Sequence, residues 1–165
     1  MLQRLGNGDY IWQSASGEVG SISNEVLSKL CTWRQSAMRD LEAGGVLLGF
    51  IDVETNGLLA TEITKPGFGD KRTRTGFYRG RRHQREVERW HEKTINGTLI
   101  GLWHTHPERK PIPSGVDMQD AINVLKKGSY VSSGLLYLIV GIAELGVWHA
   151  TSNKTLELLG YISIN

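Results

Sequence analysis

Four residues between positions 104 and 117 have the types and the spacing of a metal site. His104 and His106 are two positions apart, and Ser114 and Asp117 follow them after a short proline-containing stretch. Side chains alternate across a strand, so two histidines at this spacing project to one face and can reach one ion. Two histidines and an aspartate are the ligand set of many catalytic zinc sites, which leave a fourth position for water. The stretch therefore predicts a metal-dependent hydrolase, although it contains no general base.

The elements around this stretch must bring the ligands together. Residues 98–105 carry apolar side chains at both odd and even positions, which is typical of a strand covered on both faces. Pro107 cannot supply a ladder hydrogen bond and ends that strand. Ser114 then opens a helical pattern that places Asp117 on the first turn, pointing toward the strand end. Ser-x-x-Asp is also close to a capping box, so these two residues could be purely structural, and a capping role does not exclude a catalytic one.

The rest of the chain mixes strands and helices without strict alternation. Helical periodicity begins after Ser23 and its apolar stripe continues to Leu41, and two further helices are predicted at 81–95 and from Ser114 to a stop at Gly128. We expect residues 66–80, which hold four glycines, to be a loop. The strands are expected at 10–13, 46–51, 58–64, 98–105, 135–142, 146–150 and 155–162. This pattern predicts an α/β (α+β) layered domain with a mixed sheet.

Length and composition limit the classes to which the chain can belong. Its 165 residues fit a single domain, 1–165, and a net charge of +2 gives no general reason to expect nucleic acid. Cys31 is the lone cysteine, which fits a reducing compartment. The first residues lack the apolar core of a signal peptide, and the longest apolar run, 135–143, is far too short to span a membrane. We therefore expect a soluble cytoplasmic protein that makes no membrane contact.

A glycine-rich run upstream completes a known pattern. Read alone, Glu42 would be an exposed carboxylate at a helix end. Together, Glu42-Ala-Gly-Gly, His-x-His, Ser114 and Asp117 resemble the JAMM motif of the JAB/MPN/Mov34 metalloproteases. The resemblance implies a JAB/MPN-like (cytidine deaminase-like) fold with a curved mixed sheet flanked by helices. It further implies that one Zn²⁺ with a bound water is held by His104, His106 and Asp117, that Glu42 is the acid/base, and that Ser114 stabilises the oxyanion.

A narrower resemblance concerns the substrate. The runs Glu-Ala-Gly-Gly-Val-Leu-Leu-Gly-Phe (42–50), Ile-Thr-Lys-Pro-Gly (63–67), Arg-His-Gln (82–84) and Gly-Leu-Trp-His-Thr-His-Pro-Glu (101–108) are similar to the small bacterial JAB isopeptidases of anti-phage CBASS operons. That resemblance implies cleavage of conjugates made through the C-terminal tail of a cGAS-like nucleotidyltransferase, with an E1-E2-like conjugating protein in the same pathway. A deubiquitinase-like protease of another ubiquitin-like or sulfur-carrier system remains an alternative.

A basic segment offers a different kind of function. Between positions 71 and 85 the chain carries seven cationic residues: Lys71, Arg72, Arg74, Arg79, Arg81, Arg82 and Arg85. They could form a solvated surface, dock an acidic partner or substrate tail, or make a non-catalytic binding module. We do not expect nucleic acid as a partner, because no recognition motif accompanies these residues. Zinc held only for stability is a further alternative.

Several other residues have simpler interpretations. Phe77 and Tyr78 could line a groove for an extended tail, whereas Trp103 should point away from the two histidines into the core. Cys31 lies on an apolar stripe and is expected to be a buried, inert thiol. The histidines without ligand spacing are expected to be surface or structural residues: His83, His91 and His149.

Overall fold

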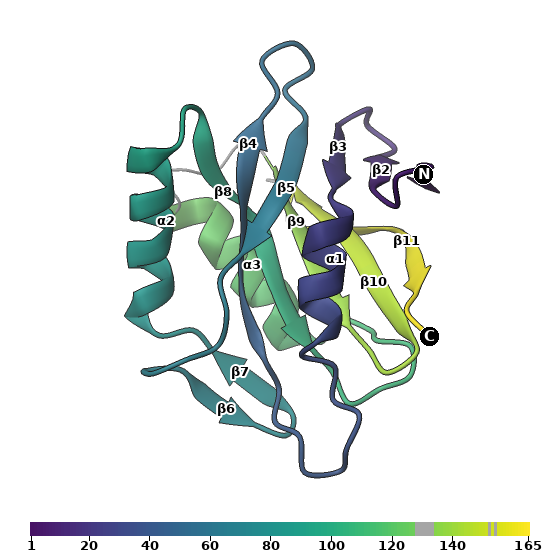
Figure 1. Ribbon diagram of the computed structural model, residues 1–165, viewed down its shortest axis with the longest axis vertical. Helices are drawn as coiled ribbons and strands as arrows, with labels where there is room; N and C mark the ends of the chain where they lie inside the picture. The colour runs from purple at the N-terminus through teal and green to yellow at the C-terminus, as the bar shows by residue number, and fades with distance from the viewer. Residues whose placement is uncertain (128–133, 152, 154) are drawn as a thin grey trace.

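The fold is built on one mixed nine-stranded sheet (Figure 1). The computed structural model describes all residues except 128–133, 152 and 154. The strand order is β1-β2-β3-β5-β4-β8-β9-β10-β11. The strands are β1 (Leu2–Arg4), β2 (Tyr10–Gln13), β3 (Val19–Ile22), β4 (Gly44–Ile51), β5 (Leu58–Ile63), β8 (Gly97–Thr105), β9 (Gly134–Val140), β10 (Glu144–Thr151) and β11 (Leu156–Ser163). A separate hairpin joins β6 (Lys71–Thr73) to β7 (Gly76–Tyr78).

The sheet curves until its two edges approach each other. Strand β8 runs parallel to β9, β3 runs parallel to β5, and the other neighbours are antiparallel. Irregularities in register interrupt the β4–β5, β4–β8 and β10–β11 pairs, and such bulges bend a sheet. A Cβ on Gly160 of β11 would lie 3.1 Å from the side chain of Leu2 in β1, so the first and last strands are in contact. This arrangement confirms the curved mixed sheet that the family resemblance implies.

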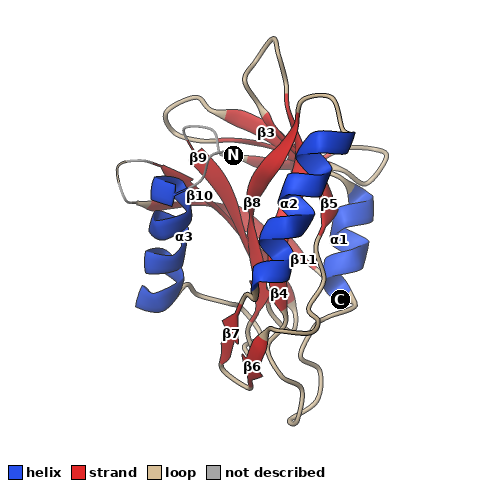
Figure 2. Ribbon diagram, turned by 90° about the vertical axis from the view of Figure 1, so that its left-hand side faces the viewer, coloured by secondary structure: helices blue, strands red, loops and turns tan. Residues whose placement is uncertain are grey.

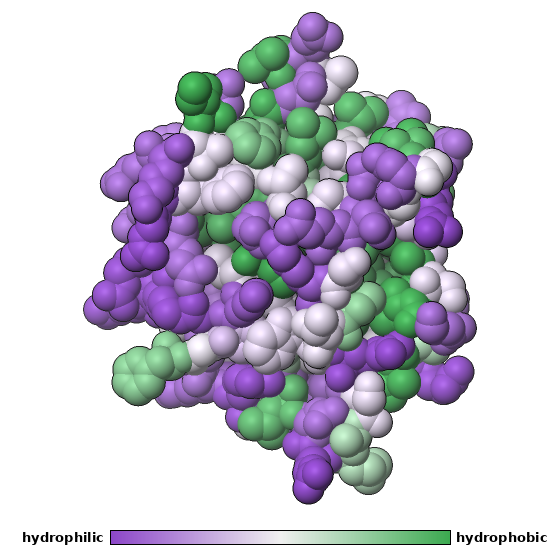
Figure 3. Space-filling view, in the orientation of Figure 1, coloured by the Kyte–Doolittle hydropathy of each residue, from purple (hydrophilic) through white to green (hydrophobic). Residues whose placement is uncertain are grey.

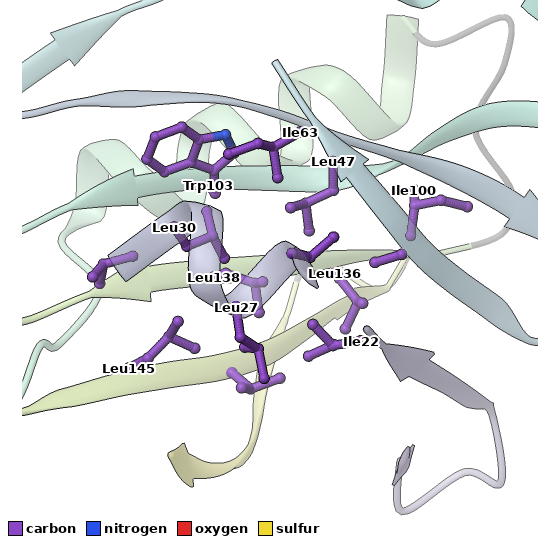
Figure 4. Packing of buried hydrophobic residues seen from close by; sticks show 14 of the residues in the cluster. Ile22, Leu27, Leu30, Leu47, Ile63, Ile100, Trp103, Leu136, Leu138 and Leu145 are labelled. Atoms are coloured by element: carbon purple, nitrogen blue, oxygen red, sulfur yellow. The ribbon is translucent and has the colours of Figure 1, made fainter. Parts of the chain in front are cut away.

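Helices cover both faces of the sheet and create two apolar cores. Helix α1 (Asn24–Cys31) lies on one face, where Leu27 and Leu30 pack over Leu136 and Leu138 of β9 (Figure 4). Helices α2 (Arg81–Lys93) and α3 (Gly115–Lys127) pack into the second core, through Val87 and Ala121. Figure 2 shows α1 and α3 on opposite sides of the sheet. The outer surface of α2 is hydrophilic, as expected for a helix with one buried stripe (Figure 3).

Strand β8 contributes to both cores because its side chains alternate. Trp103 is fully buried on the α1 side, where its indole N–H donates to the carbonyl of Thr64 at 3.0 Å. Leu102 and His104 face the α3 side, where the His104 ring contacts Tyr137 edge-on at 5.5 Å between centroids. The prediction that Trp103 points away from the histidines is therefore confirmed.

Two predictions about local structure are wrong. The first helix ends at Cys31, where the Thr32 hydroxyl donates to the Lys29 carbonyl at 2.7 Å, and the chain to residue 43 has no regular structure. Met38 and Leu41 have helical spacing, but they are 83% and 44% exposed and pack against no core. The second error is the loop expected at 66–80, because strands β6 and β7 lie within it.

The remaining element predictions are close to the structure. The strands expected at 10–13, 46–51, 58–64, 98–105, 135–142, 146–150 and 155–162 all exist within a few residues, while the short strands β1 and β3 are additional. Helix α2 begins at the expected residue. The stop expected at Gly128 lies outside the described residues. Across the part of the chain that the structure describes, we find no helix that is both long enough and apolar enough to span a membrane.

Candidate metal centre

The two motif histidines lie at the end of β8 and point to the same face. His104 is the penultimate residue of the strand, and His106 follows it. Their Nε2 atoms are 2.8 Å apart, and the two residues are 6% and 9% exposed. The chain leaves the sheet immediately afterwards at Pro107. Strand alternation and a proline stop thus produce the arrangement that the spacing predicts.

Asp117 approaches this pair from the first turn of α3. Its Oδ1 lies 3.2 Å from Nε2 of His104, and its Oδ2 lies 3.4 Å from Nε2 of His106. Ligands bound tetrahedrally to one zinc at the usual bond lengths are about 3.3 Å from one another. The three side chains therefore have the spacing and chemistry of a zinc ligand set, and they could hold such an ion.

The protonation states of two of the three residues suit metal binding. Burial lowers the pKa of His104, which favours the neutral imidazole. Burial raises the pKa of Asp117, but hydrogen bonds with His104 and His106 outweigh it and hold that pKa well below its ordinary value. Burial lowers the pKa of His106, yet Asp117, Glu42 and Glu108 together raise it above its ordinary value. A metal must therefore compete with a proton at His106.

Glu108 lies beside the outer ring nitrogen of the second histidine. Its carboxylate lies 3.6 Å from Nδ1 of His106 and accepts a hydrogen bond from the Ile112 N–H at 3.2 Å. A negative group beside Nδ1 favours the tautomer that keeps Nε2 unprotonated, which is the atom turned toward His104 and Asp117. The charge of Glu108 thus favours the form of His106 that can bind a metal through Nε2.

Glu42 lies beside the ligands although it is remote in sequence. It lies two residues before Gly44, the first residue of β4, and β4 pairs with β8 so that Gly44 is opposite His104. The carboxylate is buried, and its Oε1 is 4.0 Å from Nε2 of His106. Burial raises the pKa of Glu42 to about 7, with partial opposition from the charge of His106. The exposed helix-end position expected from the residues alone is wrong, and the position implied by the resemblance is the one the structure has.

Ser114 caps α3 at the mouth of the site. Its N–H donates to Oδ2 of Asp117 at 2.6 Å, and its Oγ accepts from the Asp117 N–H at 3.2 Å. This is the reciprocal capping box that the sequence suggests. The hydroxyl hydrogen is not used by the cap, so the same side chain keeps a donor available on the site.

A pocket of about 810 Å³ opens around these residues. One wall is the β6–β7 hairpin, with Phe77 and Tyr78, and the other is the start of α3. This confirms the groove expected at Phe77 and Tyr78. Tyr137 lies on the floor, and Arg79 reaches across to Asp120 of α3 with an N–O distance of 2.9 Å. The site is therefore a groove between two walls joined by an ion pair.

The glycines after Glu42 allow the hairpin and the core to approach β4. A Cβ on Gly44 would lie 2.4 Å from the ring of Phe77, and a Cβ on Gly45 would lie 2.4 Å from the carbonyl of Thr64. No real side chain tolerates such distances. Gly44 is thus required to seat the hairpin beside the site, and Gly45 is required for the close approach of Thr64 to β4.

Much of the basic segment supports the hairpin. Arg72 donates to the carbonyls of Leu41 and Glu42, and Arg79 pairs with Asp120. Arg74 donates to the Met38 carbonyl, and Arg82 pairs with Glu86 and donates to the Lys65 carbonyl. The exposed cations of the segment are Lys71, Arg81 and Arg85. A continuous cationic binding surface is therefore not supported.

The other histidines have structural environments. His83 is 2% exposed between Thr64 and Asp70, and His149 is 1% exposed against the ring of Trp12. His91 bonds the Gly97 carbonyl through Nδ1 at 2.8 Å. Cys31 is half-buried rather than buried, and burial raises the pKa of its thiol, which is consistent with an inert group.

Sequence reasoning missed several polar residues near the site. Asp120 and Tyr137 line the pocket, and Gln35 bonds Thr105, the residue between the two histidines. The sequence indicates Thr105 and Gln35 only weakly, since each is a polar residue in or beside an apolar segment. Asp120 lies one helical turn after Asp117, which could have placed it on the same face.

Comparisons with known proteins agree with this geometry. A family model described as prokaryotic homologs of the JAB domain matches residues 23–160. A protein of Escherichia coli named CD-NTase/cGAS isopeptidase is 34% identical over 83% of this chain and 85% of its own length. A Vibrio cholerae protein of the same name is 35% identical over 73% of this chain and 74% of its own.

A solved structure is similar in fold. The solution structure of protein DSY2949 from Desulfitobacterium hafniense superposes with a TM-score of 0.57 at 18% identity, over 87% of this chain and 88% of that one. At this level of identity the likeness concerns the fold alone. Together with the match of the family model over most of the sequence, these findings show that the chain belongs to the prokaryotic family of JAB-domain proteins.

Proposed function

We propose that this protein is a zinc-dependent isopeptidase with a single catalytic domain. The observation that carries the proposal is the convergence of His104, His106 and Asp117 within about one zinc coordination sphere, with the buried carboxylate of Glu42 beside them. The names of the relatives support the reaction class, because both are called isopeptidases.

The proposed mechanism divides the chemistry between the ion and the protein. When bound by the two histidines and Asp117, zinc would polarise a carbonyl and lower the pKa of water from about 15.7 to about 7. Glu42 would accept the proton from the attacking water and deliver it to the departing amine. A carboxyl whose pKa is near 7 is suited to both transfers at neutral pH.

Ser114 would contribute at the carbonyl oxygen. Its hydroxyl remains able to donate while its oxygen accepts the Asp117 N–H, so the cap fixes the direction of the side chain. A donor aimed at the oxygen that gains charge typically contributes about 10²–10³ in kcat. Capping and oxyanion stabilisation would thus be performed by one side chain.

We propose that the substrate is a conjugate made through the C-terminus of a CD-NTase, or cGAS-like, nucleotidyltransferase. The names of the relatives support this class, and the motif runs at 42–50 and 101–108 carry the resemblance to JAB proteins of anti-phage CBASS operons. The extended tail would lie in the groove between the β6–β7 hairpin and α3. An E1-E2-like protein would make the conjugate, and the reaction would take place in the cytoplasm.

Two alternatives make different predictions. A protease of another ubiquitin-like or sulfur-carrier system would use the same metal centre on a different tail. A binding module based on the basic segment would need free cations, yet Arg72, Arg74 and Arg82 bond groups of this chain. The structure therefore favours an enzyme over the binding module.

The direct test is cleavage of a defined fusion. A CD-NTase-family nucleotidyltransferase joined at its C-terminus to a reporter protein is incubated with the purified enzyme, with chelator, and with chelator followed by zinc. We expect chelator to abolish cleavage and added zinc to restore it. Loss of a residue that only hydrogen-bonds a zinc ligand typically weakens zinc binding roughly 10- to 100-fold. Asp117→Ala removes a ligand itself and should weaken zinc binding by more than that. Cleavage of only a ubiquitin-like or sulfur-carrier fusion would favour the first alternative, and chelator-resistant cleavage would refute zinc dependence.

A further inference from the structure

The acid/base candidate belongs to a segment without regular secondary structure. Residues 32–43 connect α1 to β4, and Glu42 is the penultimate residue of this connection. Its N–H donates to the Thr73 carbonyl at 2.8 Å, and its own carbonyl accepts from Nε of Arg72 at 2.6 Å. The hairpin strand β6 therefore holds the backbone of Glu42 from one side.

Thr105 holds the same backbone from the other side. This residue separates the two histidines, so its side chain points to the opposite face of β8 and is fully buried. Its N–H donates to the Ala43 carbonyl at 2.8 Å, and its Oγ1 accepts the Ala43 N–H at 2.9 Å. At this end of the sheet, a side-chain oxygen takes the place of the carbonyl that would normally pair with Ala43.

Gln35 determines where the Thr105 hydroxyl points. The hydroxyl donates to Oε1 of Gln35 at 2.8 Å, which leaves the Thr105 oxygen free to accept from Ala43. Nε2 of Gln35 donates to the carbonyls of Asp40 at 3.1 Å and Arg74 at 2.9 Å. Gln35 is 2% exposed, and both ends of its amide are therefore paired in the interior.

These bonds form one continuous path, which we call the Gln35 network. It runs from the Ala43 N–H through Thr105 to Gln35 and on to the carbonyls of Asp40 and Arg74. It joins the strand of the histidines, the segment of Glu42 and the turn of the hairpin. None of its side chains lines the pocket, so the network has no direct role in binding substrate.

We propose that Gln35 and Thr105 are positioning residues that set the carboxylate of Glu42 against the His104–His106 pair. The inference rests on the proposed function, in which Glu42 transfers the proton. A displacement of about 1 Å at a reacting group can cost roughly 10²-fold in rate. Loss of the network should therefore lower kcat while leaving substrate binding in the groove intact.

Two substitutions and a conservative control test the proposal. Thr105→Val keeps the shape and removes the hydroxyl, Gln35→Met removes the amide, and Thr105→Ser restores the hydroxyl. We expect Thr105→Val and Gln35→Met to lower kcat about 10- to 100-fold with unchanged KM and stoichiometric zinc, and Thr105→Ser to stay near wild type. Because both act through one path, the double variant should be little worse than either single variant.

Amide hydrogen exchange provides a readout that does not require activity. The side-chain hydrogen bonds of Gln35 go to Asp40, Arg74 and Thr105, and the path from Gln35 to Ala43 runs through Thr105. Gln35→Met should nevertheless accelerate exchange of the Glu42 and Ala43 amides in the zinc-loaded protein. A destabilised control, Val147→Ala, removes core volume on β10 outside the network. It should lower the melting temperature without changing kcat or the exchange of these two amides.

Three results would overturn the proposal. The first is a wild-type kcat in Thr105→Val, and the second is loss of kcat in Val147→Ala in proportion to lost stability. The third is loss of zinc in Thr105→Val, because Thr105 would then act on the ligands and not on Glu42. If Glu42→Gln itself retained full activity, the proposed function would fail first, and the exchange measurement would still report whether the network holds this segment.

Discussion

The most informative perturbation outside the metal centre is Asp70→Asn. Asp70 precedes the β6–β7 hairpin, and its carboxylate is completely buried. It accepts the Gly80 N–H at 2.7 Å, the Gly67 N–H at 2.8 Å and Nε2 of His83 at 3.0 Å. These bonds fix both ends of the segment that carries the hairpin, so Asp70 anchors one wall of the groove.

The size of the effect follows from the geometry. An amide keeps one acceptor oxygen and presents an NH₂ group to a backbone N–H that formerly met the second oxygen. The donor left without a partner is the N–H of exposed Gly67 or of half-buried Gly80, which places its cost near the lower end of about 1–3 kcal/mol. The bonds that remain lose the assistance of the negative charge, which costs about 1–2 kcal/mol more. We therefore expect about 3 kcal/mol of destabilisation, which lowers the melting temperature of a chain of this length by roughly 6–12 °C.

Thermal and denaturant unfolding measure this effect, and Asp52→Asn is the matched control. This variant makes the same chemical change in an exposed turn, where the Asp52 carboxylate accepts hydrogen bonds from the N–H groups of Glu54 and Thr55. Its melting temperature should stay close to wild type, since an asparagine can still accept these bonds. Equal melting temperatures for Asp70→Asn and wild type would refute the view that Asp70 anchors the hairpin.

Two further predictions concern the same region. Gly44→Ala places a Cβ 2.4 Å from the ring of Phe77, so we expect the hairpin to shift, cleavage of the fusion to fall at least about 10-fold and zinc to remain bound, measured by kinetics and metal analysis. Wild-type kinetics in Gly44→Ala would show that the hairpin need not pack there. Burial lowers the pKa of His83, so the folded state binds fewer protons at this ring, and stability should fall as pH drops below about 6.5. The loss of melting temperature between pH 7.5 and 5 should be smaller in His83→Gln, and an equal loss would contradict this assignment.

The local part of the site could be predicted from the sequence. Strand alternation places His104 and His106 on one face, Pro107 ends the strand, and the helix start places Asp117 on the first turn. These relations depend on residues within one strand, one loop and one helical turn. Local geometry is therefore sufficient to predict that the three ligand side chains lie close together.

Glu42 could not be positioned by local patterns. Its place depends on the antiparallel register between β4 and β8, which sets Gly44 opposite His104. Apolar periodicity indicates two buried strands without indicating their register, so only the family resemblance pointed to Glu42. The apolar stripe from Val26 to Leu41 also suggested a longer helix, because spacing alone does not reveal that Met38 is exposed.

The hairpin and the Gln35 network were missed for a related reason. Strands β6 and β7 have three residues each, which is too short for a period of two to be recognised. The buried amide of Gln35 is stabilised by partners from β8 and the hairpin turn, far away in sequence. Such pairs are formed by tertiary structure and leave little trace in the local sequence.

The central claim is that Glu42 transfers the proton beside a zinc held by His104, His106 and Asp117. Its most direct test is Glu42→Gln, which preserves size and leaves the backbone bonds of residue 42 in place. Zinc content and single-turnover cleavage of the nucleotidyltransferase fusion are measured on the same preparation. We predict stoichiometric zinc with cleavage slowed by about 10²- to 10⁴-fold. Cleavage by the zinc-loaded variant at the wild-type rate would contradict the claim.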